Sequence, residues 1–116
     1  MIAHLGHPWI DDALVVARKH EHVYADISAL HTRPWQLYAG LTCASEYRVI
    51  DKLLFGTDWS YATFEQTVMG LRSINRIAEG SSMPHVATED IERIIARPTL
   101  DLLRLTATEN QPQEPK

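Results

Sequence analysis

The chain has 116 residues, of which 45% are hydrophobic and 22% are charged, a composition typical of one globular domain of modest size. Its net charge of -4 comes from 15 acidic residues against 11 Lys and Arg spread along the chain, so we expect no nucleic-acid partner. No apolar run approaches the roughly 20 residues of a membrane-spanning helix, and the first residues lack the features of a signal peptide. We therefore expect no membrane partner and a cytoplasmic location.

The first predicted elements are a strand over residues 1–5 and a helix over residues 9–20. Pro8 suits the first turn of this helix, whose acidic residues lie early and basic residues late, as the helix dipole favours. A second strand is predicted over residues 22–28, where Tyr24 and Asp26 share one face. The predicted inward-facing residues of the helix recur at helical spacing and are Ile10, Ala13, Leu14 and Ala17.

A helix over residues 35–49 is predicted next, followed by a third strand over residues 53–55. This strand is too short for a helix and has no polar alternation, which indicates burial on both faces. Thr63 is the predicted cap of a helix over residues 64–79, and Gln66 completes a capping box. After a loop over residues 80–84, a last helical stretch starts at Thr88 and is interrupted at Pro98. Residues 106–116 are predicted to form a disordered tail.

Strands that alternate with helices of ten or more residues predict an α/β fold with a parallel sheet. Three buried parallel strands would leave both edges of the sheet unpaired. We therefore expect residues 1–105 to be part of a larger structure. Cys43 is the single cysteine, so no internal disulfide can form, and we expect a buried structural thiol rather than a nucleophile.

Polar residues with useful chemistry follow or lie within the three predicted strands. His4 ends the first strand, Asp26 lies in the second, and Asp58 follows the third after Gly56. Because the carboxyl ends of parallel strands share one edge, we expect these side chains to converge. An imidazole and a carboxylate can bind a metal or transfer a proton, whereas the alternatives are a helix cap for Asp58 and a structural hydrogen bond for His4.

Three ordered segments carry a resemblance to a known family. They are Ile-Ala-His-Leu-Gly-His-Pro-Trp at residues 2–9, Val-Tyr-Ala-Asp-Ile-Ser at 23–28 and Lys-Leu-Leu-Phe-Gly-Thr-Asp-Trp at 52–59. Together they resemble the carboxy-terminal part of the amidohydrolase-related metal-dependent hydrolases. This resemblance implies a partial TIM (β/α)8 barrel in which the chain supplies strands six to eight with their helices.

The resemblance also implies roles for individual residues. Asp58 resembles the aspartate after strand eight, which binds a divalent metal and takes a proton from the attacking water. His4 resembles the strand-six histidine, which orients that water and polarises the substrate carbonyl, or ligates a second ion. Zinc is the expected metal, with manganese as the alternative. Trp59 and His7 are the expected substrate contacts, with a structural role as the alternative for His7.

Two departures from the family pattern define what we expect of this chain. The His-x-His pair of strand one and the metal-binding residue midway through the barrel have no counterpart here, so the chain alone should have little activity. Arg97-Pro98-Thr99 stands where family members often carry Asn or Asp before a final helix. We expect the remaining strands one to five, or a second copy of the chain, as partner, and a small molecule as substrate.

The implied reaction is hydrolysis of an ester, lactone or amide bond by metal-activated water. Two alternatives stay open at this point. Related barrels use the same metal to decarboxylate unsaturated or aromatic acids, and Asp58 and His4 would serve either reaction. The second alternative is a remnant or assembly module with no catalytic activity.

Overall fold

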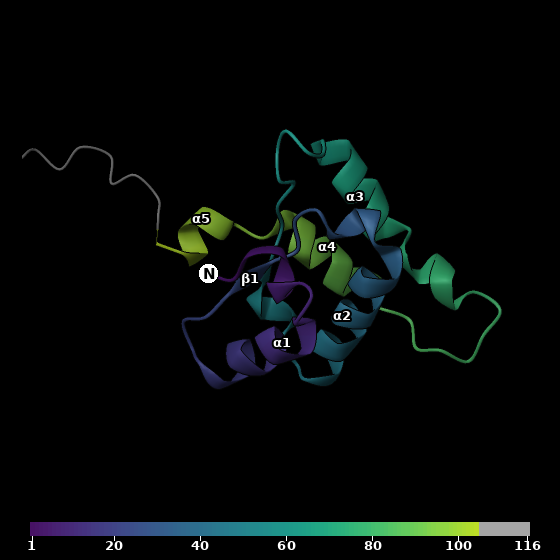
Figure 1. The fold of residues 1–116 in the computed structure, drawn as a ribbon, viewed down its shortest axis with the longest axis horizontal. Coiled ribbons are helices and arrows are strands. Elements are labelled where there is room, and N and C mark those ends of the chain that lie inside the picture. The colour runs from purple at the N-terminus through teal and green to yellow at the C-terminus, as the bar shows by residue number, and fades with distance from the viewer. Residues whose placement is uncertain (105–116) are drawn as a thin grey trace, which may run out of the picture.

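The computed structural model describes residues 1–104, and the tail predicted over 106–116 lies outside this range. Helices surround a small parallel sheet in an α/β arrangement (Figure 1). The elements in chain order are η1 (Ala3–Gly6), α1 (Ile10–Lys19), β1 (Ala25–Asp26), η2 (Leu30–Thr32), α2 (Pro34–Glu46), η3 (Ile50–Lys52), β2 (Leu53–Leu54), α3 (Phe64–Arg72), η4 (Ile74–Ala78), α4 (Thr88–Ala96) and α5 (Thr99–Leu102), where η denotes a 3-10 helix.

The sheet joins three segments of the chain in sequential order. β1 pairs with β2 in parallel, with Ala25 opposite Leu53, and Ile2 forms an isolated parallel bridge to Ala25 on the other side. Backbone N–H groups of Ile2 and Asp26 donate to Tyr24 O at 2.8 Å and to Ile2 O at 3.0 Å. The predicted parallel pairing is therefore confirmed, and the three segments end at the same side of the sheet.

The strands are shorter than the sequence indicates, and the strand predicted over residues 1–5 is wrong. Only Ile2 pairs there, because His4 and Leu5 have positive φ angles of 52° and 53° and turn the chain away from the sheet. Gly6 follows with φ 70°, and a Cβ on it would lie 2.6 Å from Ala13 Cβ. The close packing of this turn on α1 thus replaces further strand pairing.

Helix α1 has the predicted inward face and charge distribution. Its buried residues are Ile10, Ala13, Leu14 and Ala17, and its acidic and basic residues occupy the first and last turns. Helix α2 ends at Glu46, before the predicted residue 49. Arg48 adopts φ 57°, and Val49 N–H donates to Ala44 O at 2.9 Å, which is the Schellman ending of a helix.

The capping box at the start of α3 is confirmed, but this helix ends earlier than predicted. Gln66 N–H donates to Thr63 Oγ1 at 3.1 Å, and Thr63 N–H donates to Gln66 Oε1 at 3.0 Å. Ser73 Oγ donates to Met69 O at 2.8 Å, a side-chain bond that competes with the helical backbone. The chain continues past Ser73 as the 3-10 helix η4.

The junction between α4 and α5 contains the predicted interruption at Pro98. Arg97 there is only partly exposed, and its guanidinium donates to Ile50 O at 3.1 Å and to Leu53 O. Burial lowers the pKa of Arg97 below the usual arginine value. The Leu54 carbonyl points toward β1, because Leu54 O accepts a hydrogen bond from Ile27 N–H. Successive carbonyl groups of a strand point in opposite directions, so Leu53 O points to the outer edge of the sheet. Arg97 therefore covers part of that edge.

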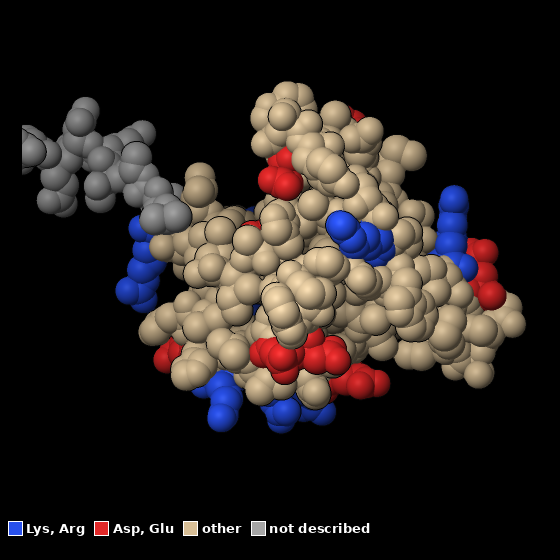
Figure 2. All heavy atoms as spheres, in the orientation of Figure 1, with Lys and Arg blue, Asp and Glu red and all other residues tan. Residues whose placement is uncertain are grey.

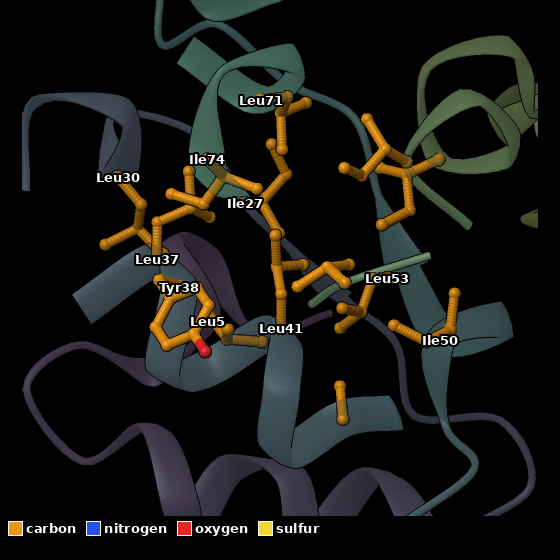
Figure 3. Close-up of a cluster of buried hydrophobic side chains, with 14 of the residues drawn as sticks. Leu5, Ile27, Leu30, Leu37, Tyr38, Leu41, Ile50, Leu53, Leu71 and Ile74 are labelled. Atoms are coloured by element: carbon orange, nitrogen blue, oxygen red, sulfur yellow. The ribbon is translucent and has the colours of Figure 1, made fainter. Parts of the chain in front are cut away.

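One apolar core lies between the sheet and the helices (Figure 3). Leucines and isoleucines from η1 through α4 meet there, and α1 packs against α2 while α3 packs against α4. The residues labelled in Figure 3 are Leu5, Ile27, Leu30, Leu37, Tyr38, Leu41, Ile50, Leu53, Leu71 and Ile74. This core fixes the strand ends on which the polar residues are carried.

Charged side chains on the face drawn in Figure 2 lie in small separate groups, and no basic stripe crosses that face. Among the helices of residues 1–104, none combines the length and apolar character needed to cross a bilayer.

Candidate active site

Unusual backbone conformations mark the ends of all three parallel segments. Six non-glycine residues in the described range have positive φ, and four of them lie at this end of the sheet. They are His4 and Leu5 after the first segment, Ala29 after β1 and Asp58 after β2. Left-handed backbone is costly for residues with a Cβ and is often retained at functional sites. The strand ends therefore carry the backbone features of a candidate functional site.

Asp26 holds the first two strand ends together. Its Oδ1 accepts a hydrogen bond from His4 N–H at 3.0 Å, from Ser28 N–H at 3.1 Å and from Ser28 Oγ at 2.5 Å. Asp26 is half-buried, while Ser28 is buried. All three donors are thereby satisfied, and Asp26 orients His4 and Ser28.

The same network fixes the ring of His4. Its Nδ1 lies 3.0 Å from Ser28 O and 2.8 Å from Ser28 Oγ. A carbonyl oxygen can only accept, so Nδ1 carries the proton, and Ser28 Oγ, which donates to Asp26, accepts on its other side. The lone pair of the neutral imidazole is consequently on Nε2. Histidines that ligate metals are commonly held in this way through their second nitrogen.

The side chain of Asp58, unlike those of Asp26 and His4, is not held by hydrogen bonds from its neighbours in the described chain. It is exposed, and within residues 1–104 its carboxylate accepts no hydrogen bond and forms no ion pair, although its backbone O accepts from Tyr61 N–H at 2.7 Å. Its φ of 56° is left-handed. The carboxylate is therefore free to bind a cation or accept a proton.

His4 and Asp58 line the same surface hollow, of about 290 Å³. The structure thus brings the two residues that the sequence predicted as catalytic and metal-binding to one place. Asp26 lies behind the hollow and reaches it only through Ser28 and His4. The lining residues are His4, His7, Ser28, Ala29, Leu30, Arg33, Asp58 and Tyr61.

The two expected substrate contacts lie in different surroundings. His7 lines the hollow, and its Nε2 is buried without a hydrogen-bond partner in the described part of the chain. Trp59 is 77% exposed and is not one of the lining residues. Substrate contact by His7 and Trp59 stays a prediction.

The donors present fit part of a metal centre. An imidazole Nε2 with a free lone pair and an unpaired carboxylate are both ligands that zinc accepts, but catalytic zinc sites use three protein ligands. In the range 1–104, no three His, Cys, Asp or Glu side chains are grouped so that they could hold an ion. His4 and Asp58 are thus two members of a possible ligand set.

Three residues at this site escaped the sequence analysis. Ser28 could have been found, because it follows Asp26 at the two-residue spacing that places side chains on one strand face. Arg33 and Tyr61 lie in connections whose paths carry no periodic signal. Cys43 lies elsewhere, within α2; it is half-buried rather than buried as predicted, and burial raises the pKa of its thiol.

The comparisons with known proteins give one match. A family model described as Amidohydrolase matches residues 1–95 of the chain. No curated protein and no solved structure gives a significant match. The matched range includes every residue that lines the hollow.

Proposed function

The chain belongs to the amidohydrolase family, and on this basis we propose that it is the carboxy-terminal part of a metal-dependent hydrolase. In this proposal residues 1–105 supply strands six to eight of a (β/α)8 barrel. The sequential order of the three parallel segments and the helices between them support it. The substrate is a small molecule with an ester, lactone or amide bond.

One observation carries the proposal: the Nδ1 hydrogen bond of His4 leaves its Nε2 with a free lone pair, and the hollow that His4 lines is also lined by Asp58, whose carboxylate has no partner among residues 1–104. The hydrogen bond from Nδ1 to Ser28 O uses the single N–H group of the neutral imidazole ring, so Nε2 carries no proton. A histidine kept for a structural role needs no such free nitrogen at a hollow. An aspartate kept as a helix cap would bind a backbone N–H, whereas Thr63 is the cap of α3.

His4 and Asp58 would hold a divalent ion, zinc in the first instance, together with ligands from the barrel strands that this segment does not include. Such an ion lowers the pKa of bound water to about 7. With an ion bound, Asp58 would accept a proton from the attacking water, because its carboxylate has no competing partner among the described residues. His4 Nε2 would orient that water or ligate the ion, and Asp26 and Ser28 hold the His4 ring in place.

Zinc calorimetry on the purified chain tests the metal part of this proposal. With only two protein ligands, we expect weak binding that does not survive dialysis and that falls at least tenfold in Asp58→Asn. Asp12→Asn is the matched control, because Asp12 is an exposed carboxylate in the first turn of α1. Equal zinc affinity in the wild type and Asp58→Asn, or stoichiometric zinc after dialysis, would contradict the ligand assignment.

Product analysis tests the reaction. The chain is assembled with the missing barrel strands and supplied with zinc, then given a panel of lactones and esters and, separately, a carboxylated phenol. We expect hydrolysis of at least one member of the first panel. Release of carbon dioxide from the phenol without hydrolysis would replace the hydrolase with a decarboxylase.

A further inference from the structure

The two outer edges of the parallel sheet differ in how their backbone groups are used. At the first edge, Ile2 N–H and Ile2 O both bond to β1, at 2.8 and 3.0 Å. The N–H and C=O groups of one peptide unit point in opposite directions, so Met1 O and Ala3 N–H point away from β1. Met1 and Ala3 are both exposed. We call this side of the sheet the Ile2 edge, and it is open in the described chain.

The outer edge of β2 is closed by contacts within the chain. Leu54 O accepts from Ile27 N–H at 3.0 Å, so Leu54 faces β1 and Leu53 faces outward. Leu53 N–H donates to Ile50 O. Leu53 O accepts from the guanidinium of Arg97, which also donates to Ile50 O at 3.1 Å. Both edge groups of Leu53 are therefore occupied.

Arg97 is held at this edge mainly by the carbonyl oxygens. Its side chain is only 11% exposed, and burial of a guanidinium costs solvation. Asp51 lies 3.4 Å from Arg97 and 3.5 Å from Arg93, but the Asp51 side chain is 78% exposed, so this ion pair stabilises little. The contact that covers Leu53 O therefore depends on one side chain at the end of α4.

The backbone groups of the two edges are complementary. In a parallel pair, one residue donates to the residue before its partner and accepts from the residue after it, as Ile2 does with β1. Leu53 would make the same two bonds with a second copy of the chain, donating to Met1 O and accepting from Ala3 N–H. The Ile2 edge of that copy would run parallel to β2 and continue the order of the sheet.

We propose that the outer edge of β2 is a pairing surface for the Ile2 edge of a second copy of this chain, and that Arg97 is a latch that keeps this surface closed. Arg97 occupies the Leu53 oxygen that the incoming Ala3 N–H needs. Proteins commonly protect sheet edges with charged side chains. Because the contact joins two different edges, it is head-to-tail and produces a series of sizes rather than one twofold dimer. The inference does not depend on the proposed metal site.

Sedimentation velocity on the full chain over a range of concentrations tests the inference. We expect Arg97→Ala to associate at least tenfold more tightly than the wild type, into trimers and larger species as well as dimers. Arg97→Lys keeps a charged donor and should associate to an intermediate degree. Arg93→Ala is the matched control, because Arg93 lies on the same helix and contacts Asp51 and Asp90 instead of the edge carbonyls. It should behave as the wild type.

The double variant Arg97→Ala with Ala3→Pro identifies the occupant of the edge. Proline has no N–H to donate to Leu53 O, and Ile2 already has the extended backbone that a following proline requires, with φ -100° and ψ 119°. We expect this variant to return to the association state of the wild type. Association that persists in it, or a single dimeric species in Arg97→Ala, would overturn the Ile2 edge as the occupant.

Two results would overturn the latch itself. One is equal association of the wild type and Arg97→Ala. The other comes from arginine side-chain NMR of the folded wild type, which is informative even where a variant unfolds. We expect the guanidinium of Arg97 to rotate slowly and that of the exposed Arg48 to rotate freely. Free rotation of both groups would show that Arg97 does not hold the edge closed.

Discussion

Two aspartates follow or end the two paired strands, yet the fold treats them in opposite ways. Asp26, at the end of β1, is half-buried and accepts three hydrogen bonds that join His4 and Ser28. Asp58, four residues beyond β2, is exposed, unpaired within the described chain and held in left-handed backbone. The position of a carboxylate after a parallel strand therefore indicates a functional site. Its hydrogen-bond partners then indicate whether the carboxylate holds neighbouring residues in place or is available to bind a metal or a proton.

The largest effect on stability is expected from Asp26→Ala. This change leaves the His4 N–H, the Ser28 N–H and the Ser28 hydroxyl without their acceptor, and we expect a loss of about 2–4 kcal/mol of unfolding free energy. Asp58→Ala is the matched control and should change the unfolding free energy by less than about 0.5 kcal/mol. Urea unfolding of both variants measures the contrast, and equal losses would refute it.

Ser28→Ala is expected to lower the free energy of unfolding by an intermediate amount. The variant loses the hydroxyl that bridges Asp26 and His4, and we expect a loss of about 1–2 kcal/mol by urea unfolding. The proton of His4 should nevertheless stay on Nδ1, because Ser28 O remains as its acceptor. Long-range nitrogen–proton NMR of the imidazole checks this, and transfer of the proton to Nε2 would show that the hydroxyl, not the carbonyl, fixes the ring.

The smallest effect of these three substitutions is expected from Asp58→Gly, which should raise the free energy of unfolding. Glycine adopts φ 56° without the Cβ penalty, and the lost carboxylate has no partner in the described chain, so we expect stabilisation by about 0.5–1 kcal/mol. Ala29→Gly, at φ 63°, is the control for the backbone effect alone. Thermal unfolding compares the two, and marked destabilisation by Asp58→Gly would mean that its carboxylate supports the fold.

Local sequence signals predicted much of this architecture. The buried stripe of α1, the capping box of Thr63 and Gln66, and the break at Pro98 each depend on residues a few positions apart. The strand over residues 1–5 was predicted wrongly, because the left-handed turn at His4 and Leu5 depends on the packing of Gly6 against Ala13. No pattern within the segment itself records that contact.

The candidate site, like the fold, was predicted only in part from the sequence. His4 and Asp58 could be paired because parallel strands end at one edge, and both line the hollow. Arg33 and Tyr61 could not, since their place depends on the course of connections between elements. The assignment to strands six to eight, the partner and the cytoplasmic location stay predictions.

The central claim is that His4 Nε2 and the Asp58 carboxylate can ligate one metal ion together. Its most direct test is imidazole NMR during a zinc titration. We predict that zinc shifts the Nε2 signal of His4 and leaves Nδ1 protonated and bonded to Ser28 O. In Asp58→Asn the same titration should leave Nε2 nearly unmoved. A zinc shift on Nδ1, or an equal Nε2 shift in Asp58→Asn, would contradict the account.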